Sequence, residues 1–246
     1  MAVVLGIDIG GSGVKAAKVD TDAGEMVSER DRIKTPKPAT PEAVAEVGRQ
    51  LAENQGWTGP VGIGFPGVVQ NGFVRTAANL DDSWIGINAD EVFTNIVGCD
   101  VRMINDADAA GLAEVRYGAG KGVSGTVIML TLGTGIGSAI FTDGKLVSNT
   151  EFGHLIMDGK IAEDRASSRA KEEKDLSFKK WGGHLEDVLK EVEKLFWPEL
   201  FILGGGISKE FDEFKEYIDK VRTPVVPAEM HNQAGIVGAG LACGRA

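Results

Sequence analysis

The feature that most constrains the fold is a strand-and-turn unit that occurs twice along the chain. In the first half, an apolar strand at 3–9 is followed by the glycine turn GGSG, a second strand, an Asp/Gly turn and a third strand. The same order returns from Thr126, as TVIMLTL, GTGIG, SAIF, TDG and KLV. Duplication of such a hairpin unit predicts two lobes of related fold.

Helical patterns alternate with these strands. Thr40 and Pro41 are a suitable cap and first residue for a helix in PEAVAEVGRQLAEN, and HLEDVLKEVEKLF has amphipathic spacing. This alternation predicts an α/β protein with mixed sheets. We expect a first lobe at 1–105 and a second at 106–232, with a small-residue helix within 233–246 packing on the first lobe.

Composition excludes several classes of protein. The 246-residue chain carries a formal net charge of -10, which argues against a general nucleic-acid or membrane-surface binder. Cys99 and Cys243 have no CxxC spacing, so a reducing compartment is expected and a structural zinc site is not. The first strand begins near Met1 with no leader-like segment, and no apolar run approaches 20 residues. A soluble cytoplasmic protein is the expectation.

Three glycine turns follow apolar strands, which favours an anion site over isolated tight turns. Glycine lets backbone N–H groups approach an anion closely, hydroxyls add donors, and a lysine adds charge. The pattern is neither a P-loop nor a dinucleotide fingerprint, because strands follow the first two turns. A phosphate chain is the expected ligand. The residues concerned are Gly10, Gly11, Ser12, Gly13, Lys15, Gly133, Thr134, Gly135, Gly137, Gly204, Gly205 and Gly206.

Three carboxylates lie at strand ends, and spacing leaves their roles open. Asp8 ends the first strand, where it could cap the turn or hold Mg²⁺ through water. Asp106 and the competing Asp108 follow the strand that ends at Asn105, where Asn105 could cap a helix and Asp106 could be its first-turn anion. Phosphoryl transfer to a hydroxyl needs one positioned base, and residues two apart on a helix cannot both face one ligand.

The motifs GIDIGGSGVK, NDADAAG, GTGIGSA, EFGH and FILGGGISK together resemble the ROK family of sugar kinases, within the actin and hexokinase superfamily. TPKPATP, FPGVV, RTAANLDDSWIG and NTEFGHL are similar to its bacterial polyphosphate glucokinase branch. The resemblance implies a two-lobed, ribonuclease H-like fold with an interlobe cleft. It also implies glucose as acceptor, polyphosphate and ATP as donors, Mg²⁺ as cofactor and a homodimer, which Trp181 and Trp197 could serve unless they are core residues.

Carried over to this chain, the resemblance makes Asp106 the general base on the glucose 6-hydroxyl. The other expected glucose contacts are Asn79, Asn105, Glu151 and His154, and the glycine turns become donor-phosphate contacts. Many relatives carry a cysteine-rich zinc motif after the GH pair, whereas this chain reads HLIMDGKIAEDRASS there. No zinc site is therefore expected at His154, while its sugar contact is.

A basic segment suggests where polyphosphate would bind. Residues 159–181 contain seven basic and five acidic side chains, a local net charge of +2 in an acidic protein. Lys121, Arg165, Arg169 and Lys171 are the candidates for a polyphosphate groove. The alternative is a solvated helix whose charges are paired.

Other functions share parts of this pattern. A ROK repressor would carry an N-terminal winged helix-turn-helix, and a catalytically silent ROK sugar sensor would be expected to lack the Asp106 base. An actin-type ATPase would not need the NDAD and EFGH segments. A strictly ATP-dependent ROK hexokinase is the alternative closest to a polyphosphate glucokinase.

Overall fold

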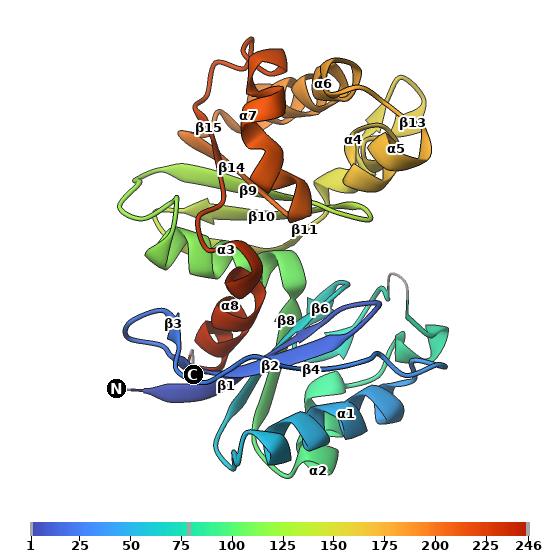
Figure 1. Ribbon diagram of the computed structural model, residues 1–246, viewed down its shortest axis with the longest axis vertical. Helices are drawn as coiled ribbons and strands as arrows, with labels where there is room; N and C mark the ends of the chain where they lie inside the picture. The colour runs from blue at the N-terminus through green and yellow to red at the C-terminus, as the bar shows by residue number, and fades with distance from the viewer. Residues whose placement is uncertain (1, 78–79, 245–246) are drawn as a thin grey trace. The chain divides into compact units, whose positions relative to one another are not determined.

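The computed structural model describes residues 2–77 and 80–244, and their contacts form two compact units (Figure 1). Unit 1 comprises Met1–Ala113 and Gln233–Ala246, and unit 2 comprises Glu114–Asn232. Residue 105, the expected boundary between the two lobes, is the last residue of strand β8 (Val101–Asn105). Contacts instead group the first part of helix α3 (Asp106–Tyr117) with unit 1.

Unit 1 is built on a mixed sheet of strand order β3-β2-β1-β5-β8, with β4 also paired to β2. Strand β1 is antiparallel to β2 and parallel to β5, which is parallel to β8. The strands are β1 (Val3–Ile9), β2 (Val14–Asp20), β3 (Glu25–Met26), β4 (Asp31–Ile33) and β5 (Val61–Phe65). A small hairpin, β6 (Val69–Gln70) and β7 (Phe73–Val74), and the 3-10 turn η1 (Asp82–Trp84) follow β5.

Alternation along the strands gives this sheet two buried faces. On one face, Leu5 and Ile7 join a core with α1 (Pro41–Asn54) and α2 (Ala89–Val97). Thr40 caps α1 by accepting the Ala43 N–H, and α2 ends at Gly98 in the left-handed conformation, with φ 80°. The expected Thr40 cap therefore marks the beginning of α1, and a left-handed glycine ends α2.

The opposite face is covered by helix α8 (Ala234–Cys243), which approaches the sheet backbone directly. A Cβ at Gly6 or Gly62 would overlap the carbonyl oxygens of Ile236 or Ala239, and a Cβ at Gly238 would overlap that of Ala109. Small residues therefore let α8 pack on β1, β5 and α3 at backbone distance.

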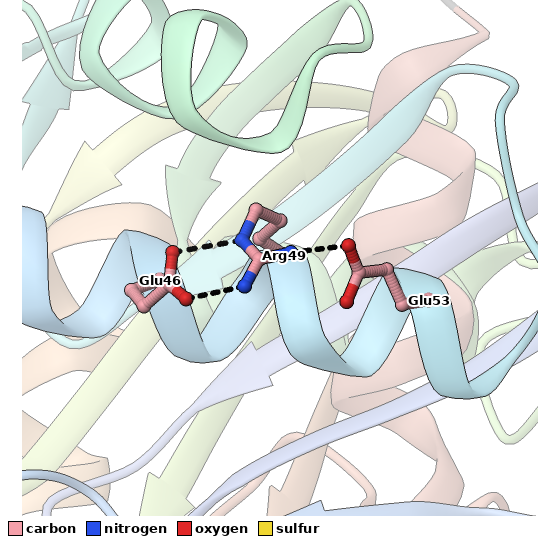
Figure 2. Close-up of polar contacts among 3 residues, drawn as sticks. All are labelled: Glu46, Arg49 and Glu53. Carbon is pink, nitrogen blue, oxygen red and sulfur yellow. Dashed lines mark hydrogen bonds and ion pairs between the residues drawn. The ribbon is translucent and has the colours of Figure 1, made fainter.

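The outer surface of α1 carries a charge cluster in which one arginine is held by two carboxylates (Figure 2). Arg49 Nε lies 2.8 Å from Glu46 Oε2, and its Nη2 lies 2.5 Å from Glu46 Oε1. Its Nη1 donates to Glu53. The three residues are three or four positions apart and therefore lie on neighbouring turns of the helix. Arg49 is thus a surface arginine whose charge is paired with two carboxylates.

Unit 2 contains a five-stranded sheet of order β11-β10-β9-β14-β15. Its strands are β9 (Thr126–Leu132), β10 (Ile136–Thr142), β11 (Lys145–Thr150), β14 (Leu200–Gly204) and β15 (Val225–Pro227). Strands β9, β10 and β11 form the second copy of the hairpin unit expected from the repeat. A two-stranded sheet, β12 (Ile156–Met157) and β13 (Lys160–Ile161), lies after β11 in the chain.

The core of unit 2 forms between its sheet and the long amphipathic helix α6 (Phe178–Phe196). Trp181 is fully buried there, and its indole N–H donates to the carbonyls of Ala166 and Ser167. Trp181 is thus a core residue and not a surface for another chain, whereas Trp197 is 65% exposed. The shorter elements are η2 (Phe152–His154), α4 (Glu163–Ala166), α5 (Ser168–Glu173), η3 (Gly206–Glu210), α7 (Phe211–Phe214), η4 (Lys215–Tyr217) and η5 (His231–Gln233).

Candidate active site

The first glycine turn is a tight hairpin between β1 and β2. The Gly10 N–H donates to the Gly13 carbonyl at 3.1 Å, and the Gly13 N–H donates to the Gly10 carbonyl at 3.3 Å. Thr35 Oγ1 also donates to the Gly10 carbonyl, at 2.5 Å. Gly11 and Ser12 form the exposed tip. The turn is therefore held at its base, and its tip presents backbone to solvent.

Asp8 and Lys15 form an ion pair beside this turn. They are opposite each other in the β1–β2 ladder, and Lys15 Nζ lies 2.9 Å from Asp8 Oδ2. The Asp8 side chain is 22% exposed, so water can reach it. One accessible carboxylate next to a phosphate turn fits Mg²⁺, which keeps several waters and takes few protein ligands. Among the described residues, no group of three acidic, histidine or cysteine side chains could hold a metal by itself.

A pocket of about 410 Å³ opens within unit 2, around the second glycine turn. It brings together residues that the sequence placed in three separate motifs: the turn GTGIG, the basic segment and the GGG turn. Its lining consists of Leu132, Gly133, Thr134, Ser168, Arg169, Lys171, Glu172, Gly206, Ile207 and Glu210. Two cations beside exposed turn backbone make this pocket suitable for phosphate groups.

Helix α5 fixes the second glycine turn against the pocket. The Arg169 N–H donates to the Gly133 carbonyl at 3.1 Å, and Ser168 Oγ donates to the Leu132 carbonyl at 3.0 Å. Lys171 Nζ lies 4.1 Å from the centre of the Phe178 ring, which orients the lysine by a cation–π contact. The basic side chains thus come from a helix that is hydrogen-bonded to the turn itself.

Three other predicted glycines lie within a strand, at its end or directly after it. Gly137 lies within β10, paired with Thr131, and Gly204 ends β14. Gly205 has φ 88°, and a Cβ on it would overlap the Leu132 carbonyl. Gly205 therefore sets the backbone path that leads to Gly206, which lines the pocket. Any other residue at position 205 would strain the turn.

Glu151 directly precedes η2, and His154 is the last residue of η2, in the EFGH segment after β11. Burial raises the pKa of the Glu151 carboxyl; His154 opposes this increase and the negative charge of Glu163 adds to it. His154 is exposed. A half-buried carboxylate beside an exposed imidazole is a suitable pair for hydroxyl recognition.

The raised pKa of Glu151 predicts a pH-dependent stability difference. A carboxyl whose folded pKa lies above its ordinary value of 4.5 destabilises the folded state once it ionises, because the folded form binds the proton more tightly. We expect Glu151→Gln to be more stable than wild type at neutral pH, with the difference vanishing below pH 4.5. Urea unfolding across pH measures this; a difference that grows toward acid would contradict it.

Glu163 is one of the five acidic residues of the basic segment, and its side chain contacts two of the predicted motifs. Its Oε2 accepts the Ile136 N–H at 3.2 Å, and a Cβ on Gly135 would overlap the same oxygen. A Cβ on Gly153 would lie 3.0 Å from it. One carboxylate thus touches both the GTGIG turn and the EFGH segment. No local spacing signals this, because the contacts join residues far apart in the chain.

At the end of β8, burial distinguishes the two carboxylates that compete for the role of general base. Asn105 caps α3, since its Oδ1 accepts the Asp108 N–H at 3.0 Å and its Nδ2 donates to the Gly67 carbonyl at 3.2 Å. Asp108 is 1% exposed, whereas Asp106 is partly exposed at the first position of the helix. Asp106 is therefore the carboxylate that a ligand from solvent can reach. Asn79, the remaining predicted sugar contact, lies outside the described residues.

Two of the four predicted groove cations lie apart from the pocket lining. Arg165 is paired with Asp158 at 3.0 Å and with Asp187 at 3.4 Å. For this residue, the pairing matches the alternative of a helix whose charges are paired. Lys121 is exposed in the turn after α3. Arg169 and Lys171 are the two that line the pocket.

Comparison with known proteins identifies the family and similar structures. Residues 4–174 match the ROK family. The polyphosphate glucokinase of Mycobacterium tuberculosis (strain CDC 1551 / Oshkosh) is 52% identical over 239 residues, which are 97% of this chain and 90% of that protein. The crystal structure of an inorganic polyphosphate/ATP-glucomannokinase from Arthrobacter sp. strain KM matches with a TM-score of 0.93 and 50% identity over 98% of both chains. A ROK family glucokinase from Streptomyces griseus, solved with glucose and AMPPNP, matches with a TM-score of 0.82 and 26% identity over 98% of this chain and 99% of that one.

Proposed function

The chain belongs to the ROK family, and on that premise we propose that it is a polyphosphate-dependent glucokinase. It transfers the terminal phosphoryl group of inorganic polyphosphate to the 6-hydroxyl of glucose. The observation that carries this function is the unit 2 pocket, where Arg169 and Lys171 stand beside the Gly133–Thr134 turn. Cations around exposed backbone suit a chain of phosphates that has no base or ribose to bind.

On the acceptor side, Asp106 acts as the general base. Its carboxylate takes the proton of the glucose 6-hydroxyl as that oxygen attacks the terminal phosphorus. The bond from phosphorus to the bridging oxygen breaks, and the donor leaves one phosphate shorter. Asn79, Asn105, Glu151 and His154 orient the sugar through its other hydroxyls. Partial exposure of Asp106 and burial of Asp108 support this choice of base.

On the donor side, the two glycine hairpins and residues 204–206 bind phosphate. Kinases of this kind typically use a metal ion, and we assign Mg²⁺, held by Asp8 through water. When bound, the ion neutralises charge that develops on the donor phosphates. The Asp8–Lys15 pair keeps both charges beside the turn at 10–13, so each is oriented before the donor arrives.

ATP is the second donor in this proposal. Its triphosphate would occupy the same glycine turn, with the adenosine near Gly206 and Ile207 at the pocket wall. A donor-competition measurement tests this: ATP should inhibit polyphosphate use competitively, with glucose saturating. Non-competitive inhibition would mean that the two donors use separate sites, and no phosphorylation from ATP would limit the enzyme to polyphosphate.

The pocket predicts which cations matter for the donor. Replacing Arg169 and Lys171 together with alanine should raise the KM for polyphosphate at least tenfold, because two charge-assisted phosphate contacts are lost. The KM for glucose should change little. The matched control is Arg165→Ala, which removes an equally basic residue that is paired with Asp158 and Asp187. Steady-state kinetics decide the point: equal effects of Arg165→Ala and of the double substitution would remove the pocket from the donor site.

Assembly and location complete the proposal. We infer a homodimer, for which the exposed apolar residues Leu195, Phe196 and Trp197 at the end of α6 are available. Sedimentation velocity would test the dimer. Within the described chain, none of the helices has the length and apolar character needed to span a bilayer. A cytoplasmic location is part of the same proposal.

A further inference from the structure

A stripe of cations follows the edge strand β4 of unit 1. Arg30, Arg32 and Lys34 alternate with Asp31 and Ile33, and all three basic residues are exposed while the other two are half-buried. Arg32 is the central residue of β4, and Arg30 and Lys34 directly flank the strand. The three cations, here called the β4 stripe, lie at alternate, exposed positions in a protein of net charge -10.

The β4 stripe is attached to the first glycine turn. Arg32 is opposite Lys15 in the β2–β4 ladder, so both side chains share a face of the sheet. The guanidinium lies on Gly13, where a Cβ would be 2.6 Å from Arg32 Nε, and Nη2 donates to the Ser12 carbonyl at 3.3 Å. Only glycine at position 13 leaves room for this arrangement.

The Arg32 guanidinium differs from that of Arg49 in its charged surroundings. Within residues 2–77 and 80–244, no carboxylate forms an ion pair with its guanidinium, although Lys15 lies opposite. Asp31 binds elsewhere: its Oδ1 accepts the Arg32 backbone N–H and its Oδ2 accepts the Asn54 amide. Arg49, by contrast, is bound by two carboxylates (Figure 2). Asp8 pairs with Lys15, so the exposed guanidinium of Arg32 is the charge here that an anion from solvent can meet.

We propose that the β4 stripe, with Lys15 and the turn at 10–13, binds phosphates of the polyphosphate chain as a donor contact of unit 1, in addition to the pocket of unit 2. This inference rests on the proposed function. An arginine fork matches phosphate oxygens, and several exposed cations close together in the chain suit a polyanion. A long chain can contact more of these cations than the three phosphates of ATP, so the stripe favours polyphosphate over ATP.

The central test compares Arg32→Ala with Arg49→Ala, which removes the same charge from the same unit. Arg32→Ala should raise the KM for polyphosphate roughly tenfold, as expected for losing one charge-assisted contact. Arg49→Ala should leave it near wild type, and the KM for ATP should rise less than that for polyphosphate in the Arg32 variant. Arg32→Lys should restore part of the loss, because it keeps the charge but not the fork.

Salt dependence gives a second readout. Replacing Arg30, Arg32 and Lys34 together should reduce the slope of log KM for polyphosphate against log salt by about 0.7 for each phosphate contact removed, by analogy with single-stranded nucleic acid. An unchanged slope and KM, equal to those of Arg49→Ala, would overturn the proposal. The cations would then only protect an edge strand from pairing with other chains.

A binding measurement separates this inference from the proposed function. Calorimetric titration of tripolyphosphate into Arg32→Ala and Arg49→Ala proteins needs no turnover, and both single variants are surface substitutions. Weaker binding in the Arg32 variant supports the stripe even if glucose is not the acceptor. Equal binding in the two variants refutes it even if wild type makes glucose 6-phosphate from polyphosphate.

Discussion

Replacing Asp106 with asparagine is expected to lower turnover by at least ~10²-fold, the low end for removing a general base. The substitution keeps the size of the side chain and an oxygen that can accept the Ala107 N–H, which Asp106 Oδ1 accepts at 2.8 Å. The fold should therefore survive, and the KM for glucose should change less than turnover does. Turnover is measured with saturating glucose and polyphosphate.

Asp108→Asn is the matched control for this prediction. Asp108 is two residues away on α3 and buried, so its replacement should affect the free energy of unfolding more than turnover. The opposite pattern, with normal turnover in Asp106→Asn and inactive Asp108→Asn, would transfer the role of base to Asp108.

Gly238→Ala should destabilise unit 1 by about 3 kcal/mol, the upper part of the usual range for overpacking. The added Cβ would overlap the Ala109 carbonyl, which is backbone and cannot rotate away. Helix α8 would have to move from α3, and its contacts with β1 and β5 would loosen. Thermal or urea unfolding measures the loss.

The control is Gly183→Ala, in the interior of helix α6. A Cβ there meets nothing within 4 Å, so the substitution should stabilise the protein by about 0.5–1 kcal/mol through helix propensity alone. If both variants behaved alike, close packing of α8 would not explain the glycine at position 238.

The fold class was predictable because its main signals are local. Each hairpin is specified by apolar alternation that stops at a glycine turn, and both appear as expected, from Val3 to Met26 and from Thr126 to Thr150. The matches to ROK structures at TM-scores of 0.93 and 0.82 confirm the predicted fold class. Small residues in α8 indicated close packing but not its partners, since these are specified by contacts between distant segments.

The site was less predictable, because its geometry depends on contacts between segments. The sequence grouped Arg165 with Arg169, but they lie in different helices, α4 and α5. Arg165 pairs with Asp158 and Asp187, and Arg169 lines the pocket. Asp106 and Asp108 could not be ranked by spacing, and burial distinguishes them. Glu163 gave no signal because its partners are in other segments. The role of each residue in turnover stays a prediction.

The most direct measurement of the central claim follows the donor phosphorus itself. Wild-type protein is incubated with glucose, Mg²⁺ and polyphosphate, with nucleotide removed, and ³¹P NMR records the reaction. The account predicts that the terminal phosphate signal of polyphosphate is converted to glucose 6-phosphate. Release of inorganic phosphate alone, or glucose 6-phosphate that forms only after ATP is added, would contradict it.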